Sequence, residues 1–387
     1  MYMYMYEYGT CVMYLYEISY VITIWNNFSA GYHCQSMTDQ TRTKVIITGA
    51  SGYLGQHLLQ FWLSEEDEKS QYSTGLDIVA LYGTLPSFAE DCRKAYPSKC
   101  QSSSVPRNEL LKVVSLDLLD EGAVSKFFAE ENPDVVVHLA AMSSIGVCEE
   151  DPEKAMKVNC PTYLSDALSS NVKLIFLSTD QVYDGDMSGS GNIPNQRLYF
   201  ESDLAKPVNA YGRTKLEFEN YILKNRSESL TVCLRSSLIL GPRTNLRCRK
   251  QSFLQFVLDR LENSNPCNFF TDEWRSMVYV KDVCNFIDCF VDKSGSSSDS
   301  LASGVFNMGG PRRVSRFDFA SAIGKSCFPD RSDEDIAKVV KAVAKSSLPV
   351  GKVKSPPDIS MCSSKLQDTT KIESTDFKIF IGDCNET

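Results

Sequence analysis

The chain has 387 residues, of which 43% are hydrophobic and 23% are charged, and this length and composition suit one α/β sheet with a large core and a smaller lobe. Its formal net charge of −9 argues against nucleic acid or an anionic membrane as a partner. The 14 cysteines show no CxxC pair, which favours reduced thiols in a cytoplasmic protein over a disulfide framework or a metal site.

Residues 1–36 are rich in tyrosine and methionine, and glutamates interrupt their apolar runs. These runs are too short for a membrane span, and neither a basic segment nor a small-residue cleavage site marks a secretory signal. The globular pattern starts just after Asp39. We therefore expect Met37 to be the functional start and residues 1–36 to be a disordered or artefactual leader.

The segment from Lys44 to Leu63 reads KVIITGASGYLGQHLLQFWL and predicts a buried strand, a glycine turn and an amphipathic helix. In such a unit Gly49 permits the tight turn, Gly52 lets the backbone approach a pyrophosphate, and Gly55 packs the helix against the strand. The start of the helix offers N–H groups and a positive dipole end to an anion. The GxxGxxG spacing leaves a purely structural strand-turn-helix as the alternative.

Apolar strands and amphipathic helices then alternate along the chain. Further strands are predicted at Leu76–Tyr82, Leu111–Asp117, Val135–Ala141, Val172–Thr179 and Leu230–Gly241. Helices are predicted at Glu121–Glu130, Pro152–Leu168 and Tyr211–Leu223, and a polar surface loop with one helical turn at Pro86–Glu109. This alternation predicts an α/β fold with a doubly wound parallel Rossmann sheet.

After Gly241 the pattern loosens. Helices are predicted at Phe253–Leu261 and Val283–Val291, a short strand at Met277–Val280, and two weak helices from Phe317 onward. We assign residues 37–241 to an NAD(P)-binding Rossmann domain, and residues 242–387 mainly to a smaller, interleaved C-terminal substrate lobe that also takes the loop 186–206. Residues 304–310 are expected to return to the main sheet. The last residues predict no convincing amphipathic helix.

Tyr211 and Lys215 belong to the sequence YGRTK and project from the same face of a predicted helix, because they are four residues apart. A lysine ammonium near a phenol stabilises the phenolate and lowers the tyrosine pKa toward the range of an acid/base catalyst. A YxxxK match also arises readily by chance, which is the alternative.

Ser178, Thr179 and Asp180 stand at the C-terminal end of the fifth predicted strand. Ligands of open α/β sheets bind outside the carboxyl ends of the strands. A hydroxyl there can hydrogen-bond a substrate carbonyl and orient it toward the tyrosine. The alternative is a turn-forming cluster of polar residues.

Together these motifs resemble the extended short-chain dehydrogenase/reductase superfamily from about Lys44 to the C-terminus. The markers are TGASGYLG, HLAA, STDQVYDG, YGRTK, LRSSLILGP and VYVKDV. Within the superfamily, STDQVYDG followed by YGRTK is similar to the branch that holds dTDP-4-dehydrorhamnose reductase and the regulatory β subunit of methionine adenosyltransferase. The tail SPPDISMCSSKL at Ser355–Leu366 also resembles that branch, where it closes the substrate lobe.

The resemblance implies roles for named residues. Tyr211 would donate a proton to the carbonyl oxygen as hydride arrives from the cofactor, Lys215 would hold the nicotinamide ribose and tune Tyr211, and Thr179 would fix the carbonyl. Asp180 and Arg275 would join Thr179 in binding the substrate, with Arg275 at its diphosphate. The expected cofactor-binding residues, besides Tyr211 and Lys215, are Gly49, Ser51, Gly52, Tyr53, Leu54, Gly55, Asp117, Leu118, Ala140, Ala141 and Met142.

Three further interpretations carry stated alternatives. His138 is expected to be a packed structural histidine rather than a catalyst. A surface arginine in a short loop is the alternative for Arg275. The basic run Arg243–Lys250 is either a phosphate clamp or a solvated loop, and we favour the loop.

The second predicted strand ends in Tyr82, Gly83 and Thr84, without an acidic residue to take the 2′-hydroxyl of an adenosine. The 2′-phosphate of NADP would meet no repulsion there, so NADP is favoured over NAD, which stays possible. No arginine stands at that turn to bind the phosphate.

The leading hypothesis is an NADP-dependent reductase of a 4-keto nucleotide sugar. The rival is a regulatory β-like subunit that binds the cofactor without turnover and docks to the catalytic subunit of methionine adenosyltransferase. An extended reductase with another carbonyl substrate is the third reading.

Overall fold

The computed structural model describes residues 42–64, 75–83, 85–100, 110–186, 198–248, 250, 252–291, 303–349, 351 and 353–383. The predicted leader, residues 1–36, lies outside the described residues. From Thr43 onward the chain forms one compact unit.

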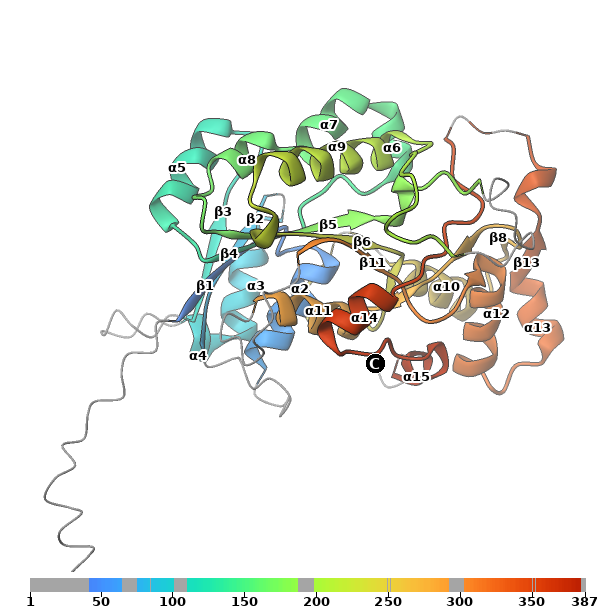
Figure 1. Cartoon of the computed structure of the whole chain (residues 1–387). Coiled ribbons are helices and arrows are strands. Elements are labelled where there is room, and N and C mark those ends of the chain that lie inside the picture. Colours follow the sequence, from blue (N-terminus) through green and yellow to red (C-terminus); the bar gives the residue numbers. More distant parts are fainter. Residues whose placement is uncertain are drawn as a thin grey trace, which may run out of the picture. The chain divides into compact units, whose positions relative to one another are not determined.

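Seven parallel strands form the central sheet, in the order β11-β6-β5-β4-β1-β2-β3 (Figure 1). They are β1 (Thr43–Thr48), β2 (Leu76–Tyr82), β3 (Leu111–Ser115), β4 (Val135–His138), β5 (Lys173–Thr179), β6 (Thr231–Ser236) and β11 (Gly304–Met308). The chain runs outward from β1 to β3, crosses back to β4 and then runs the other way. The predicted doubly wound parallel sheet is therefore confirmed, with its topological switch between β1 and β4.

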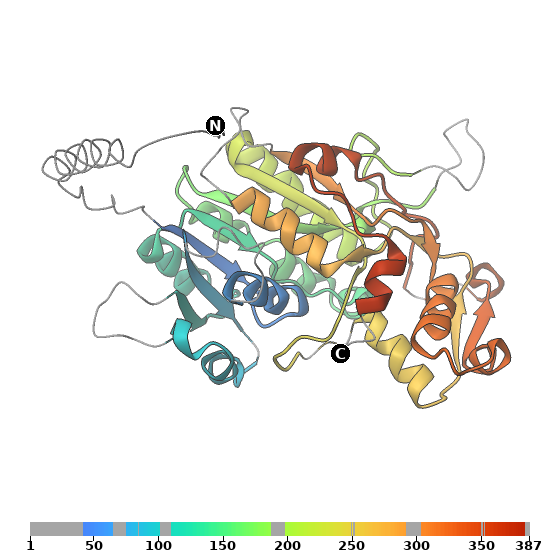
Figure 2. The same ribbon diagram turned by 90° about the horizontal axis from the view of Figure 1, so that it is seen from below.

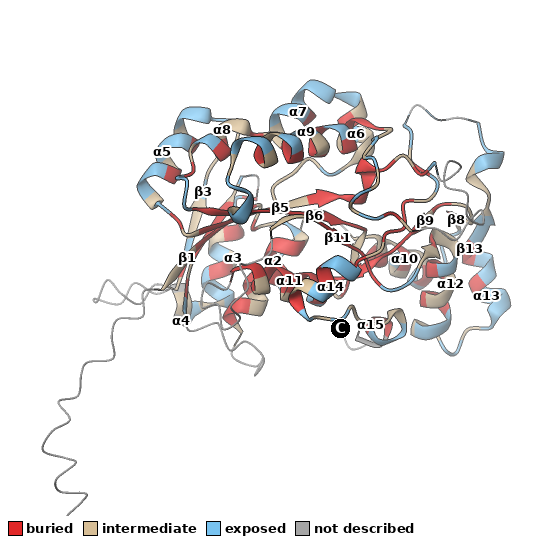
Figure 3. Ribbon diagram, viewed as in Figure 1, coloured by how far each residue is buried: buried red, intermediate tan, exposed pale blue. Residues whose placement is uncertain are grey.

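Both faces of the sheet are covered, which explains why its strands read as continuous apolar runs. Val45 and Ile47 of β1 belong to one buried cluster, together with Leu58. Ile46 points to the other side, into a second cluster with Phe218. Figure 3 shows the buried residues concentrated in the strands and on the helix faces that meet them.

Two helical layers enclose the sheet (Figure 1). One layer contains α5 (Glu121–Glu131), α6 (Ile145–Glu150), α7 (Pro152–Asn159), α8 (Thr162–Asp166) and α9 (Ala210–Asn225). The other contains α2 (Tyr53–Leu63), α3 (Phe88–Ala95), α4 (Pro97–Cys100), α11 (Val280–Val291) and α14 (Ser364–Thr370). The indole N–H of Trp62 in α2 donates to Asp288 of α11 over 2.7 Å, so α11 packs beneath the sheet although it follows the lobe's first helix in the chain.

The remaining elements lie beyond the carboxyl ends of the strands, as Figure 2 shows from a second direction. Their helices are α10 (Phe253–Glu262), α12 (Arg316–Cys327), α13 (Asp333–Val339) and α15 (Phe377–Asp383). Three strand pairs join them: β7 (Ile239–Leu240) with β10 (Val278–Tyr279), β8 (Cys267–Phe270) with β13 (Val340–Val343), and β9 (Trp274–Arg275) with β12 (Val314–Ser315). Phe253 of α10 contacts Phe269 and Phe319, which ties these pieces together.

Several predicted boundaries are wrong for local physical reasons. The single helix expected at Pro152–Leu168 is two helices, because Pro161 has no N–H to donate and disfavours helical geometry at Cys160. The fourth strand ends at His138 rather than Ala141. The sixth predicted strand is interrupted after Ser236 and resumes as β7.

Other differences concern helices that the pattern hid. Residues 88–100 form α3 and α4 instead of a loop with one turn, and α3 carries acidic residues in its first turn and basic residues in its last. The sequence pattern did not predict the short helix α6. At the C-terminus α15 forms because Phe380 and Ile381 bury their side chains, with Phe380 stacked on Tyr279 at 5.4 Å. In the part of the chain that the structure describes, no helix combines the length and apolarity needed to cross a bilayer.

Candidate active site

The three glycines after β1 form a turn with no room for side chains. Gly49 has φ +70°, and a Cβ there would lie 2.7 Å from the backbone nitrogen of Ala140. A Cβ on Gly55 would lie 2.6 Å from the Gly49 carbonyl oxygen, and one on Gly52 would lie 3.1 Å from it. The amide of Gly52 closes the turn by donating to the Gly49 carbonyl over 2.9 Å. Glycine is therefore required at the turn itself.

The first turn of α2 has the features of an anion site. Gly52 is the N-cap and makes no side-chain capping bond, so no side chain of its own competes for the first amides. Ser51 precedes it, and the Ser51 carbonyl accepts from the Gln56 side chain over 2.8 Å; Leu54, two residues later, is buried in the core. The Tyr53 hydroxyl donates to the Pro242 carbonyl over 3.0 Å. These residues fit a dinucleotide pyrophosphate at this end of the helix.

Residues 140–142 follow β4 and lie against the glycine turn. The Ala140 amide donates to the Thr48 hydroxyl over 3.3 Å. The Asn159 side chain holds Met142, accepting from its amide over 2.7 Å and donating to its carbonyl over 3.1 Å. Ala141 lies between these two hydrogen-bonded residues, so the segment is held in place beside the glycine turn.

The two residues expected near the adenine follow β3. Asp117 is exposed, and its carboxylate accepts from the Leu119 amide over 3.0 Å. The Leu118 carbonyl accepts from the Tyr163 hydroxyl. Their contact with an adenine stays a prediction.

Tyr211 and Thr179 meet at the carboxyl end of β5. The side chain of Asn209 caps α9 by accepting from the Gly212 amide over 2.9 Å. A Cβ on Gly212 would lie 2.1 Å from the Gln181 carbonyl oxygen, so this glycine lets α9 press against the turn after β5. This packing places Tyr211, which directly precedes Gly212, beside the turn that contains Thr179 and Asp180.

The predicted effect of Lys215 on Tyr211 is wrong. Burial raises the pKa of Tyr211, the nearby Asp180 and Cys148 raise it further, and the proximity of Thr179 acts in the other direction. The Lys215 amine turns into the protein, donates to the Leu177 carbonyl over 2.8 Å and lies 4.5 Å from the centre of the Phe176 ring. The Leu177 carbonyl and the Phe176 ring therefore stabilise the ammonium group of Lys215, which does not contact the Tyr211 phenol.

Burial also lowers the pKa of Lys215 to about 7, although the nearby carboxylate of Glu219 opposes the shift. The side chain is 1% exposed. Lys215 therefore exchanges its proton near neutral pH while Tyr211 stays protonated.

Asp180 is buried at the floor of the site. Its carboxylate accepts from the Ser237 hydroxyl over 3.0 Å and from Nε2 of the Gln181 side chain over 3.3 Å. Burial raises its pKa, and the positive charge of Arg275 opposes that shift. Asp180 and Arg275 are thus close enough for their charges to interact, although they belong to elements far apart in the sequence.

Arg275 is 1% exposed, so the surface-arginine alternative is wrong. Its guanidinium donates to the carbonyls of Pro356, over 3.1 Å, and Pro357, over 3.3 Å, and to the Ser355 hydroxyl over 3.3 Å. Arg275 in this way fastens the tail segment onto the lobe. A diphosphate contact for Arg275 stays a prediction.

Glu273, which had no predicted role, is the centre of a charged cluster in the lobe. Its carboxylate accepts from Arg316, from Lys345 over 2.7 Å and from Ser355 over 2.5 Å. Burial opposes its charge, but Arg316 and Arg275 hold its pKa at about 2. The partners come from distant parts of the chain, so no local sequence signal could have found the cluster.

A second buried network supports the site from below. The Glu219 carboxylate of α9 accepts a hydrogen bond from Nη2 of Arg235 over 2.8 Å and another from the Ser178 hydroxyl. Arg235 donates through Nη1 to the Tyr183 hydroxyl over 3.0 Å, and Tyr183 donates to Asn307 over 2.7 Å. The sequence offered one sign of this network, because Arg235 is a charged residue within an otherwise apolar predicted strand.

His138 is the packed structural histidine that the sequence predicted. Its ring is fully buried and stacks on Phe176, and its Nδ1 lies 2.7 Å from the Thr48 hydroxyl. Burial lowers the pKa of His138 to about 3, so the imidazole stays neutral.

The parallel sheet, the glycine turn and the Tyr211–Thr179 pair define a Rossmann-type protein of the extended short-chain dehydrogenase/reductase class. The chain belongs to the RmlD substrate binding domain family, whose model matches residues 43–386. This membership confirms the resemblance seen in the sequence.

Named relatives fall into both groups that the sequence suggested. Methionine adenosyltransferase 2 subunit beta of Bos taurus is 27% identical over 285 residues, 72% of this chain and 71% of the bovine protein. A dTDP-4-dehydrorhamnose reductase of Aggregatibacter actinomycetemcomitans is 25% identical over 266 residues, 68% of this chain and 84% of that protein. The solved dTDP-4-dehydrorhamnose reductase of Bacillus anthracis, in complex with NADP, shares the fold with a TM-score of 0.63 at 19% identity, over 89% of this chain and 98% of that one.

Proposed function

We propose that the protein is an NADP(H)-dependent reductase of a 4-keto nucleotide sugar. The observation that carries the proposal is the packing of α9 at Gly212 against Gln181, which places Tyr211 beside the Thr179–Asp180 turn at the carboxyl edge of the sheet, on the same edge as the glycine turn. The similarity to dTDP-4-dehydrorhamnose reductase supports this substrate class.

The residues divide the work of carbonyl reduction. Tyr211 is the proton donor, and burial suits it to this role because a raised pKa keeps the phenol protonated at neutral pH. Thr179 holds the substrate carbonyl oxygen within reach of that phenol. A bound nicotinamide dinucleotide supplies the hydride. Asp180, anchored by Ser237, shapes the floor against which the sugar lies.

A second candidate function is a regulatory subunit that binds the cofactor and docks to the catalytic subunit of methionine adenosyltransferase. Two observations favour it. The bovine relative is named methionine adenosyltransferase 2 subunit beta, and the Lys215 amine donates to the Leu177 carbonyl instead of facing the phenol. In that case the site would act as a ligand-sensing element without turnover.

One experiment separates the two. The full chain would be mixed with NADPH and a dTDP-4-keto-6-deoxyhexose, and NADPH oxidation would be followed by absorbance, with Tyr211→Phe alongside. We expect turnover in the wild type and a loss of about 10²–10⁴-fold in the variant. If the wild type binds NADPH without turning over and co-purifies with a methionine adenosyltransferase catalytic subunit, the regulatory function replaces the reductase.

A further inference from the structure

Residues 243–248, here called the strap, lie across the edge of the glycine turn. The Gln56 side chain donates to the Arg247 carbonyl over 3.0 Å while it also holds the Ser51 carbonyl. Just beyond the strap, the Lys250 amine donates to the Ser143 hydroxyl over 2.8 Å. The strap is therefore a loop with exposed arginines, as the sequence analysis favoured, but its backbone is tethered beside the glycine turn.

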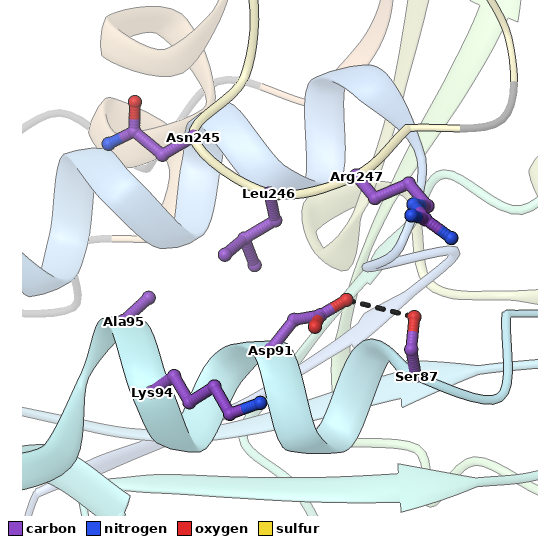
Figure 4. Close-up of a pocket in the computed structure, with 7 residues that line it drawn as sticks. All are labelled: Ser87, Asp91, Lys94, Ala95, Asn245, Leu246 and Arg247. Atoms are coloured by element: carbon purple, nitrogen blue, oxygen red, sulfur yellow. Dashed lines mark hydrogen bonds between the residues drawn. The ribbon is translucent and has the colours of Figure 1, made fainter.

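An open cavity of about 450 Å³ separates the strap from α3 (Figure 4). Leu246 and Arg247 face it from the strap, and Ser87, Asp91 and Lys94 face it from the other side. Its walls therefore combine one acidic and two basic side chains with a hydroxyl.

The cavity adjoins the end of β2. The Tyr82 ring, at the last position of β2, lies 5.4 Å from the ring of Phe88, the first residue of α3. In Rossmann folds the end of the second strand faces the 2′ position of the adenosine ribose, where an acid selects NAD and an arginine accommodates the 2′-phosphate of NADP. The sequence offers neither at Tyr82 and Gly83, but the fold brings Arg247 to this place from the far side of the sheet.

The charges of the cavity suit an anion. Arg247 is exposed, and no carboxylate within the described ranges lies at ion-pair distance from its guanidinium. Lys94 pairs with the exposed Glu90, over 3.3 Å, a weak pairing that an anion can replace. Asp91 is occupied as the acceptor of the Ser87 hydroxyl over 2.9 Å, the bond drawn in Figure 4.

We propose that Arg247 on the strap, with Lys94 of α3, binds the 2′-phosphate of NADP(H) and selects it over NAD(H). The inference rests on the proposed function only in that the chain binds a nicotinamide dinucleotide. The strap thereby supplies, from a distant part of the chain, the arginine that is missing from the turn after β2.

The test measures the affinity of the full chain for NADPH and for NADH, which differ only in the 2′-phosphate, by isothermal titration calorimetry. Arg247→Ala should weaken NADPH binding about tenfold or more and leave NADH binding within about twofold, because a charge-assisted contact is lost with one ligand only. Lys94→Ala should act in the same direction with a smaller effect. Arg243→Ala is the matched control, since Arg243 lies on the strap but does not line the cavity, and it should leave both affinities unchanged. Arg247→Lys keeps the charge and should retain part of the preference.

Equal losses for NADPH and NADH in Arg247→Ala would overturn the inference, because the residue would then act on a part that both ligands share. Unchanged binding of both would overturn it as well. If the wild type binds neither ligand, the inference falls together with the cofactor assignment. A wild type that prefers NADPH through Arg247 but reduces no keto sugar would refute the proposed reductase and leave this inference standing.

Discussion

Replacing Arg235 by methionine should strongly destabilise the protein. Arg235 and Glu219 form a buried ion pair, with side chains 7% and 1% exposed and a closest N–O distance of 2.8 Å. Methionine keeps most of the arginine volume but removes the charge and three hydrogen bonds to Glu219. Glu219 would then keep only the Ser178 hydroxyl as a partner among those the structure shows.

The magnitude follows from the burial of the remaining charge. Removing one partner of a buried ion pair costs about 3–5 kcal/mol, since the other charge stays in a medium that solvates it poorly. A urea titration followed by tryptophan fluorescence should show this loss. With a slope of roughly 3 kcal/mol per molar urea, the midpoint should fall by about 1–1.7 M.

Two comparisons make the reasoning refutable. Arg235→Met combined with Glu219→Gln removes both charges and should recover at least half of the loss, because replacing a whole buried pair by neutral groups is often close to neutral. Lys325→Met breaks an exposed pair with Asp333, over 3.0 Å, and should cost at most about 1 kcal/mol. A cost below about 1 kcal/mol for Arg235→Met, or a double variant no more stable than the single one, would refute this account.

Two further predictions concern the site itself. Gly49→Ala should lower the thermal midpoint by several degrees, because it forces a side chain into positive φ and against Ala140, whereas Gly146→Ala meets no atom within 4 Å and should not lower it; equal effects would contradict the steric argument. The pKa of Lys215 is about 7 in the folded protein, below its ordinary value of 10.5, so the unfolded chain binds more protons between these values and stability should rise with pH above 7, by up to about 1.4 kcal/mol per unit. Urea titrations between pH 6.5 and 8.5 should show this slope in the wild type and a smaller one in Lys215→Met; the same slope in both would show that Lys215 is not its source.

Local patterns in the sequence predicted the elements of the sheet well. Val45, Ile46 and Ile47 had to form a strand buried on both faces, because three adjacent β-branched residues suit no amphipathic helix. Residues 304–310 were expected in the sheet, and Gly304–Met308 pairs with β6. Boundaries failed where a single residue decided them, as Pro161 did between α7 and α8.

The positions of the candidate site residues were predictable, but the environment of their charges was not. Local motifs placed Gly49 in the turn after the first strand, Thr179 at the end of the fifth strand and Tyr211 near the start of a helix, as the structure has them. The direction of the Tyr211 pKa was predicted wrongly, since neither burial nor the turn of Lys215 toward the Leu177 carbonyl is encoded in the YxxxK spacing.

The amino-acid sequence alone determined which segments become strands and helices, and which glycines and hydroxyls stand at the carboxyl edge of the sheet, because these depend on neighbours within a few residues. Only the tertiary structure decided the environment of the charged groups. Arg275 became a buried anchor for the tail, and Arg247 came to lie beside α3, through contacts between residues far apart in the chain. Solvation and charge pairing depend on everything packed around a group, so they emerge only when the chain is folded.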